Sequence, residues 1–361
     1  MKSEGTSKKK LKKALKTSTA VVLLTTAVLS VIYRLPLCFE SQNPAALAAA
    51  AFTLTNGEYK LENSKAEKPT ESANAEPVAE KNHKRDKSTY YDSYGNHDGE
   101  NKYTVEERTI GDTGTQVDNC FVKNKTGLSL DFDGLLSAKL PFSIDKGINS
   151  PQVLIYHTHT SEAYLDEDVN FFYDSFYSRT NNNDFNVVAV GDALTEQLNK
   201  RGIKTVHDTT IHDESYNGSY DRSVDTVYKN LEKYPDIKVV IDLHRDAIGT
   251  DENKVKPVFT YNGKKGAQIM ILAGCDTDGE RGFDCWEENL NFALKIQDKA
   301  ETLYPDMTRP LNFDYFAYNE YVCNGSLLIE VGTESNSIDE ATYSGCLLYT
   351  SDAADDTPCV D

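Results

Sequence analysis

Three short apolar runs, each continuing into polar side chains, place the strongest constraint on the fold of this chain. They occupy residues 153–156, 239–241 and 327–329 and consist of aliphatic residues with a single tyrosine. Such runs are typical of strands inside a parallel sheet, whose two faces are both covered. Further strands are expected at 203–206 and 267–273, and helices at 187–201 (after a strand edge), 223–231 and 286–303. This alternation predicts one α/β domain with a largely parallel or mixed sheet flanked by helices.

The residues that follow these runs are of types that bind metal ions. The first run continues into His157, His159 and Glu162, the second into Asp242, His244, Arg245 and Asp246, and the third into Glu330. Ligands of open α/β sheets bind beyond the carboxyl ends of the strands, so these side chains are expected to converge. A lone histidine there is more often a hydrogen-bonded structural residue. A buried, unpaired Glu330 would cost on the order of several kcal/mol, however, and the joint occurrence favours a metal site.

The predicted zinc ligands are His159, Glu162 and His244. Imidazole and carboxylate groups are normal zinc ligands, and a catalytic zinc usually keeps a fourth position for water. His159 is favoured because it forms a His-x-x-Glu pair with Glu162. His157 lies two residues earlier and would point the same way in an extended chain, so the choice between the two histidines stays open.

Glu330 is the predicted catalytic residue. Zinc lowers the pKa of water bound to it, and a nearby carboxylate is then needed to move that proton to the leaving amine. Asp242, Arg245 and Asp246 flank the third ligand. One of the two aspartates could orient an imidazole, whereas Arg245 could hold a substrate carboxylate or polarise the scissile carbonyl.

The N-terminal region predicts export from the cytoplasm. Residues 1–18 are basic, and residues 19–39 are apolar enough to span a bilayer if Arg34 lies at the interface. We favour an uncleaved single-pass membrane anchor over a signal peptide cleaved near residues 46–50. Under both interpretations the basic flank stays in the cytoplasm, and the remainder of the chain is extracytoplasmic.

Composition predicts how the exported part is organised. Residues 57–108 have few aliphatic side chains, so residues 40–108 are expected to be a flexible linker. Residues 109–150 should lead into the domain and pack on it, and residues 151–345 should form the catalytic domain. The net charge of −19 argues against nucleic-acid binding. Seven scattered cysteines without a Cys-x-x-Cys pair predict no disulfide.

Five segments, taken in order, resemble the stage II sporulation protein P family: PQVLIYHTHTSEAY, GSYDRSVDTVY, VVIDLHRDAIG, ENLNFALKIQ and GSLLIEVGTESNSIDEA. The resemblance covers about residues 120–345. It implies a zinc-dependent N-acetylmuramoyl-L-alanine amidase with an amidase-like (phosphorylase/hydrolase-like) fold. The implied reaction is hydrolysis of the bond between N-acetylmuramic acid and L-alanine in peptidoglycan, with cleavage of peptide cross-links left open.

The resemblance also implies a setting and a set of residues. The setting is forespore engulfment, beside stage II sporulation proteins D and M. The family's zinc ligands fall on His159 (or His157), Glu162 and His244, and its catalytic glutamate falls on Glu330. Arg222 and Asn319 lie in family motifs, where substrate contact and packing are equally expected.

The C-terminal end departs from the family pattern. Residues 337–343 begin a final helix, but residues 346–361 lack helical amphipathic spacing and resemble translated sequencing-adapter read-through. We therefore suspect an artefact from about Cys346 onward and expect the family's full C-terminal helix to be missing.

Two other functions fit parts of the same pattern. A zinc carboxypeptidase-like peptidase would use the same ligand types and could hold a substrate C-terminus with Arg245. A catalytically silent wall-binding module that recruits partners would also suit an exported protein. Such a binder has no use for a buried Glu330, which argues against the silent module.

Overall fold

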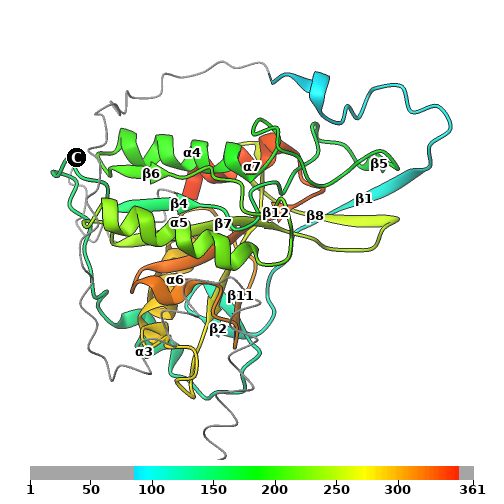
Figure 1. Ribbon diagram of the computed structural model, residues 1–361. Helices are drawn as coiled ribbons and strands as arrows, with labels where there is room; N and C mark the ends of the chain where they lie inside the picture. Colours follow the sequence, from blue (N-terminus) through cyan, green and yellow to red (C-terminus); the bar gives the residue numbers. More distant parts are fainter. Residues whose placement is uncertain (1–84, 349–361) are drawn as a thin grey trace, which may run out of the picture. The chain divides into compact units, whose positions relative to one another are not determined.

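The computed structural model describes residues 85–348, whose larger sheet has eight strands (Figure 1). In spatial order these are β2 (Thr115–Val117), β3 (Cys120–Asn124), β11 (Leu311–Asp314), β10 (Ile269–Gly274), β12 (Ser326–Thr333), β7 (Val239–Asp246), β4 (Val153–Tyr156) and β6 (Thr205–His207). The strands from β12 to β6 run parallel, as do those from β3 to β10. The β10–β12 and β2–β3 pairs are antiparallel, which confirms the predicted mixed sheet.

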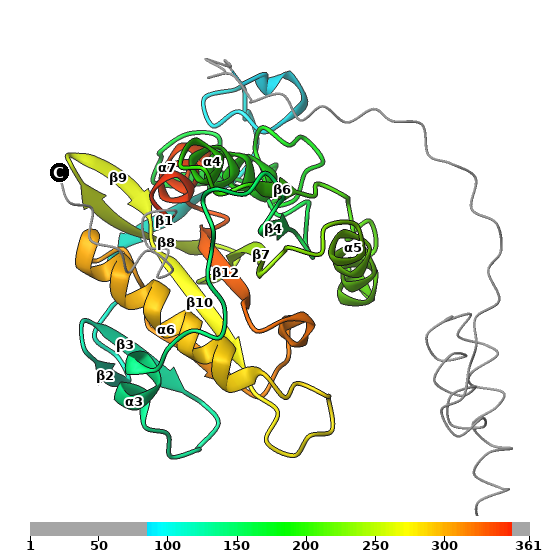
Figure 2. The same cartoon turned by 90° about the vertical axis from the view of Figure 1, so that its left-hand side faces the viewer.

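Helices cover both faces of this sheet. Helices α4 (Val187–Lys200), α6 (Trp286–Leu303) and α7 (Ile338–Leu348) lie on one face, and α5 (Ser219–Lys233) lies on the other (Figure 2). Successive strand residues point to opposite faces, so Ile155 packs in the main core with Leu194 of α4. Tyr156 packs instead with Val227 of α5. This two-sided burial explains why the strands are apolar throughout.

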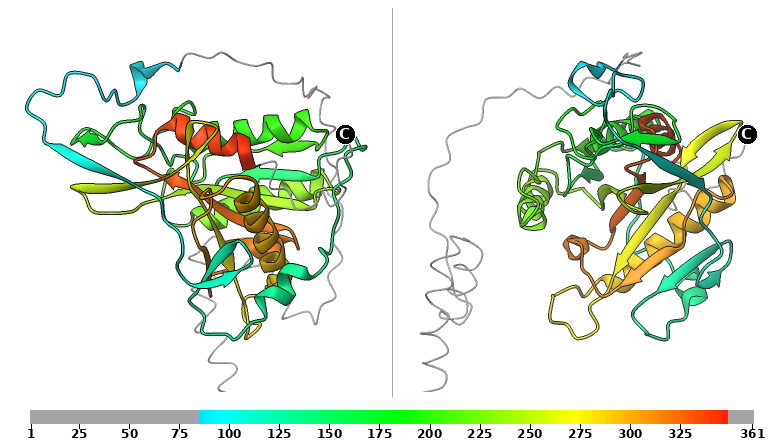
Figure 3. Two further views of the ribbon diagram at one scale, coloured as in Figure 1. Left: turned by 180° about the vertical axis from the view of Figure 1, so that it is seen from behind. Right: turned by 90° about the vertical axis from the view of Figure 1, so that its right-hand side faces the viewer.

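A smaller sheet of four strands extends from the domain (Figures 1 and 3). Its order is β5 (Phe171–Tyr173), β1 (Lys102–Arg108), β8 (Asn253–Tyr261) and β9 (Lys264–Ala267). The β8–β9 hairpin turns at Asn262-Gly263, where both residues have positive φ. Asn-Gly is the favoured pair for this tight turn.

Within the described residues, secondary structure begins before the linker boundary predicted at residue 108. A 3-10 turn, η1 (Lys87–Thr89), and strand β1 both lie inside the predicted linker, and β1 pairs with β5 and β8. Charged side chains dominate β1 because it is exposed along most of its length, and this polarity conceals a strand. Residues 109–150 contain β2, β3 and α3 (Phe132–Ser137), and Val122 and Phe132 pack into the main core.

Two further boundaries differ from the sequence-based expectation. The strand edge expected at 187 is absent from the described part of the chain, because Asn186 caps α4 and Val187 is already helical. Helix α7 continues to Leu348, three residues into the segment interpreted as an artefact, so the final helix is present. Its buried residues include Ile338, Ala341, Gly345 and Leu348, a helical face that the small residues obscure.

Several expectations concern residues outside the described range. The basic segment 1–18, the anchor or signal at 19–39, most of the linker and residues 349–361 all lie there. Within residues 85–348, no helix is long and apolar enough to cross a bilayer. The cysteines of this range, namely Cys120, Cys275, Cys285, Cys323 and Cys346, are free thiols.

Candidate metal centre

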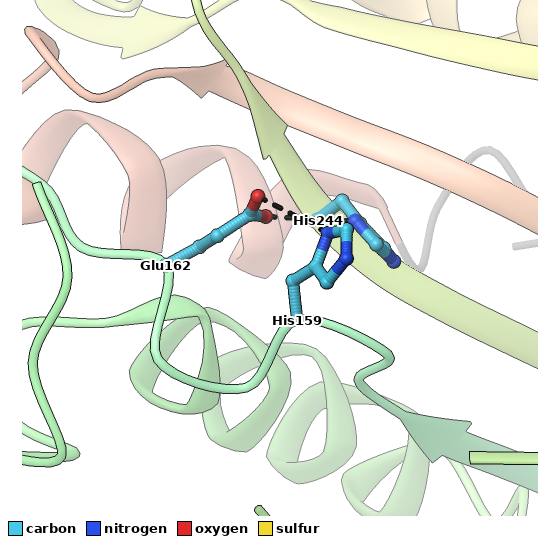
Figure 4. Close-up of side chains that lie close together, drawn as sticks. All are labelled: His159, Glu162 and His244. Atoms are coloured by element: carbon cyan, nitrogen blue, oxygen red, sulfur yellow. Dashed lines mark ion pairs between the residues drawn. The ribbon is translucent and has the colours of Figure 1, made fainter. Parts of the chain in front are cut away.

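His159, Glu162 and His244 converge at the carboxyl ends of β4 and β7, with their side chains pointing toward one another (Figure 4). One potential ligand atom from each residue lies within 4.8 Å of the others. Nδ1 of His159 and Nδ1 of His244 are each 3.5 Å from a different oxygen of Glu162. All three side chains are buried. The structure therefore brings together the three predicted ligands.

The relative lengths of two strands create this convergence. Tyr156, the last residue of β4, pairs with Asp242 of β7, which continues to Asp246. His244 therefore lies beyond the end of β4, where the chain leaves the sheet. A turn follows there, in which the amide of Glu162 donates to the carbonyl of His159 (3.1 Å). This turn brings the two residues of the His-x-x-Glu pair side by side.

The outer nitrogen of each imidazole lies close to a polar neighbour. Nε2 of His159 lies 3.0 Å from Oγ of Ser219. Nε2 of His244 lies 2.9 Å from Oδ1 of Asp242, which in turn accepts from the amide of Thr158 (2.8 Å). The Nδ1 atoms of both rings therefore face Glu162. Metal-binding histidines commonly use the other nitrogen for such an orienting contact.

Positive charge surrounds the carboxylate of Glu162. Nη2 of Arg179 is 3.5 Å and Nη1 of Arg245 is 4.0 Å from Oε1, and the amide of Arg245 donates to Oε2 (3.2 Å). Burial alone would raise the pKa of Glu162, but Arg245, His159 and His244 together hold it well below its usual range. Glu162 is therefore ionised, which is the form that binds a cation.

The residue His157 lies outside the cluster. Its Nδ1 donates to the carbonyl of Leu243 (2.8 Å), and its Nε2 is 2.8 Å from Nε2 of His207. Burial, with His207 nearby, lowers the pKa of His157 to about 3, so the ring is neutral. Of the two histidines that the sequence left open, only His159 is placed beside Glu162 and His244.

Glu330 lies on β12, directly across from His244 in the parallel β12–β7 register. Its Oε2 atom is buried and has no hydrogen-bond partner among residues 85–348. Burial raises the pKa of Glu330 to about 8, with Glu162 and Asp246 adding to the rise and His244 opposing it. A carboxyl group in this state can hold or release a proton near neutral pH.

The other flanking residues have structural contacts. The guanidinium of Arg245 donates to the carbonyls of Ala163 (3.2 Å) and Ser178 (2.7 Å), so it braces the turn around Glu162. Asp246 accepts from Arg309 (2.8 Å) and belongs to a different contact network from Asp242. Of the three flanking residues, Asp242 and Arg245 contact the cluster.

Arg222 and Asn319, both in family motifs, make packing contacts. Arg222 donates to the carbonyls of His212 (2.7 Å), Asn217 (3.1 Å) and Ser215. Asn319 donates to the carbonyl of Tyr220 (3.0 Å) and to Oγ of Ser223 (3.1 Å). Both side chains hold loops near the site in place.

Sequence reasoning missed the residues that surround the cluster. Besides Arg179 and Ser219, these are Tyr216, whose ring stacks on His159 with centroids 4.7 Å apart, and Tyr220, which contacts both histidine rings at 5.8 and 6.5 Å. Arg179 also lies over the ring of Tyr216, 5.3 Å from its centroid. No ligand spacing connects these residues to the cluster, because the loops carrying Arg179 and Tyr216 and the start of α5 are brought there by the fold.

The fold and the cluster define a mixed α/β protein with a buried His-Glu-His constellation at the carboxyl edge of its parallel strands. The model of the family described as "Stage II sporulation protein P (SpoIIP)" matches residues 40–349, and the chain belongs to this family. The stage II sporulation protein P of Bacillus subtilis (strain 168) is 28% identical over 207 residues, which cover 52% of this chain and 47% of that protein. The match thus spans about half the length of this relative.

Solved structures with partial likeness are amidases by name. The CwlD amidase of Clostridioides difficile, solved with the GerS lipoprotein, is 14% identical, with 55% of this chain and 95% of that chain covered and a TM-score of 0.32. An N-acetylmuramoyl-L-alanine amidase of Clostridium difficile 630 is 16% identical, with coverage of 57% and 94% and a TM-score of 0.31. Ami1 of Mycobacterium abscessus is 10% identical, with coverage of 57% and 96% and a TM-score of 0.29.

Proposed function

We propose that this protein is a zinc-dependent peptidoglycan hydrolase, namely an N-acetylmuramoyl-L-alanine amidase. Its substrate would be the amide bond between N-acetylmuramic acid and L-alanine, and cleavage of peptide cross-links is a further activity to test. The observation that carries the proposal concerns one edge of the sheet. Three side chains that could hold a metal ion lie there together with a separate carboxyl group of raised pKa, that of Glu330. A metal site without catalysis has no need for a second carboxyl group of raised pKa.

The donor set suits zinc. Two imidazole nitrogens and one carboxylate are normal ligands of a catalytic zinc site. Zinc bound by His159, Glu162 and His244 would lower the pKa of water and polarise the substrate carbonyl. Burial lowers the pKa of His244, but Asp242 and Glu162 outweigh that effect and raise it well above its usual value. Binding of a cation would therefore displace a proton from this ring.

Glu330 would carry the proton in the reaction. Its position across from His244 places it on the neighbouring strand, at the same sheet edge as the cluster. As a carboxylate it can accept a proton from the attacking water, and as an acid it can then protonate the leaving amine. The cluster ligand Glu162 has a lowered pKa and stays ionised, so the two carboxyl groups have different roles.

The cellular part of the proposal comes from the family and from the N-terminal sequence. We infer a single-pass anchor at residues 19–39 in the cell membrane, an extracytoplasmic catalytic domain, and action during forespore engulfment beside stage II sporulation proteins D and M. The zinc carboxypeptidase-like alternative is less well supported, because Arg245 is occupied by the carbonyls of Ala163 and Ser178 rather than free for a substrate carboxylate.

Digestion of purified sacculi by the full-length chain tests the activity. Mass spectrometry should find glycan strands without peptides together with intact stem peptides. Glu330→Gln should abolish hydrolysis while zinc binding, measured by chelator competition, is retained. Glu334→Gln is the matched control, since this buried glutamate pairs with Lys254 (2.6 Å), and it should keep the activity. Shortened stem peptides as the sole products would contradict the amidase proposal and support the peptidase.

A further inference from the structure

Five aromatic rings, one of them the imidazole of His159, contact one another in sequence past the candidate metal site. Tyr216 stacks on His159 with centroids 4.7 Å apart, and His159 meets the edge of Tyr220 at 5.8 Å. Tyr220 contacts Tyr318 at 6.5 Å, and Tyr318 contacts Phe316 at 5.7 Å. The two ends of the line, Tyr216 and Phe316, are each 62% exposed. Singly exposed aromatic side chains are common, and Tyr94 and Tyr177 are more exposed still. What distinguishes Tyr216 and Phe316 is their connection, through ring contacts, to a ring of the candidate metal site.

The loop that carries Phe316 is held in an unfavourable backbone conformation. Tyr318 has a φ of 43°, in a left-handed region that bulky residues rarely adopt, and Asn319 follows with a φ of 58°, which asparagine tolerates. Such strain persists only where surrounding contacts enforce it, and it concentrates at ligand sites. Here Asn319 supplies one such contact, because it donates to the carbonyl of Tyr220 on α5.

A close approach of backbones fixes the other side of the same loop. A Cβ atom on Gly274 would lie 1.9 Å from the carbonyl oxygen of Phe316, so only glycine lets the loop lie against β10. Oε2 of Glu320 also accepts from the amide of Gly274 (2.7 Å). The exposed ring of Phe316 is therefore presented by a fixed loop.

The chemistry of this line suits sugar rings. Pyranose rings carry C–H groups on one face, which pack against the electron-rich face of an aromatic ring, and hydroxyl groups at the edge that stay in water. A protein partner would need a contiguous patch of about 800 Å² on this chain, which separate rings in a row do not supply. The net charge of −19 disfavours anionic lipid or nucleic acid.

We propose that Tyr216 and Phe316 are the two ends of a platform that binds the glycan strand across the metal centre. Sugars on either side of the cleaved residue would rest on these rings, and Tyr220 and Tyr318 would connect them past the cluster. The identity of the ligand rests on the proposed amidase function. The platform itself rests on ring contacts, exposure and the fixed loop.

Binding of peptide-free glycan strands to the full-length protein tests the platform. Phe316→Ala and Tyr216→Ala should each weaken binding about fivefold or more, and should raise KM for sacculi more than KM for a single-sugar muramyl peptide. Phe316→Trp should restore binding, because it restores the ring. Tyr228→Ala, at an exposed tyrosine of α5 (50% exposed), is the control and should bind strands normally.

Thermal unfolding of each variant shows whether it is folded. Unchanged strand binding by both folded alanine variants would overturn the platform, even if the wild-type protein hydrolyses sacculi. The platform would also be overturned if the alanine variants lost affinity for isolated stem peptides or for anionic vesicles but bound strands normally. Strand binding through these rings by a wild-type protein that hydrolyses nothing would support the platform and contradict the amidase proposal.

Discussion

Two carboxyl groups at one sheet edge differ in protonation because of their neighbours. Burial raises the pKa of both Glu162 and Glu330. Around Glu162, Arg245 and the two histidines outweigh burial, and its pKa is well below the usual value. Around Glu330, His244 and Arg245 only partly offset burial and the nearby carboxylates, and its pKa is about 8. Groups whose surroundings drive their pKa values apart are suited to separate roles, here ligand and proton carrier.

The first residue-scale prediction concerns the two neighbouring histidines. His159→Asn should weaken zinc binding by more than the roughly 10–100-fold that loss of an orienting partner costs, and Asp242→Asn should fall within that range. His157→Asn should bind zinc as the wild type does but unfold at a lower temperature, because its ring donates to the carbonyl of Leu243. Chelator competition and thermal unfolding measure the two effects. Equal loss of zinc affinity in both histidine variants would contradict the assignment.

The second residue-scale prediction concerns how the stability of the metal-free protein depends on pH. The native state holds the proton of Glu330 up to about pH 8, whereas the unfolded chain releases it near the ordinary value of 4.5. Between these values the native state binds more protons, so the contribution of Glu330 to the free energy of unfolding falls as the pH rises. Glu330→Gln should flatten that fall and be more stable than the wild type at the alkaline end. Urea unfolding across this window, with chelator present, measures the slopes. Identical slopes would show that Glu330 titrates normally.

At the scale of elements, the unequal lengths of two strands position the site residues, and one helix packs behind the strand of Glu330. Strand β4 stops at Tyr156 while β7 continues to Asp246, which leaves room for the turn carrying His159 and Glu162. Helix α7 follows β12, the strand of Glu330, and packs on α4, where a Cβ on Gly345 would lie 2.8 Å from the carbonyl of Val190. The end of α7 is therefore part of the core behind the site.

The prediction at this scale tests that end of α7. Leu348 is buried beside Leu194 and Ile329, where it lines a small apolar cavity. Leu348→Ala should lower the free energy of unfolding by about 2–3 kcal/mol, because it enlarges a void in the core. Leu303→Ala, at a leucine of α6 that is 37% exposed, should change it by no more than about 0.5 kcal/mol. Denaturant unfolding compares them. Equal effects would mean that residues 346–348 add nothing to the core.

At the scale of the whole described part, one buried lysine connects the smaller sheet to α7. Nζ of Lys256, on β8, is 3.1 Å from Glu340 of α7 and 3.6 Å from Glu107 of β1, and it also pairs with Asp168. The side chain of Lys256 is 2% exposed. These acidic residues gather around an internal cation, which accounts for their closeness without a metal.

Lys256→Met is therefore expected to destabilise the protein by about 3 kcal/mol, since it leaves the buried carboxylate of Glu340 without its cation. Lys265→Met is the matched control. Lys265 contacts Glu107 and Asp168 but is 40% exposed, so its loss should cost about 0–1 kcal/mol. Urea unfolding measures both. A Lys256 effect no larger than that of Lys265 would contradict the connecting role.

The sequence by itself was sufficient to predict the strands that are buried on both faces and the helix with a regular apolar face. Strands β4, β7 and β12 are covered on both faces, so their apolar runs predict them, and the periodicity of α6 predicts its bounds at Trp286 and Leu303. Strand β1 escaped prediction because it is mostly exposed and carries charged side chains. Strand β8 is buried over its middle, but Lys254, Lys256 and Pro257 interrupt its apolar pattern. Their pairing partners lie far away along the chain, and local pattern carries no information about such contacts.

For the site, the sequence determined which residue types stand at the ends of the buried strands, because strand direction brings those ends to one edge. Only the tertiary structure separates the surroundings of His157 and His159, since a turn after Tyr156 directs one ring to Glu162 and the other to Leu243 and His207. It alone placed Arg179 and the aromatic line beside the cluster. Hydrogen bonds and ring contacts between distant loops made those choices, and spacing along the chain does not encode them.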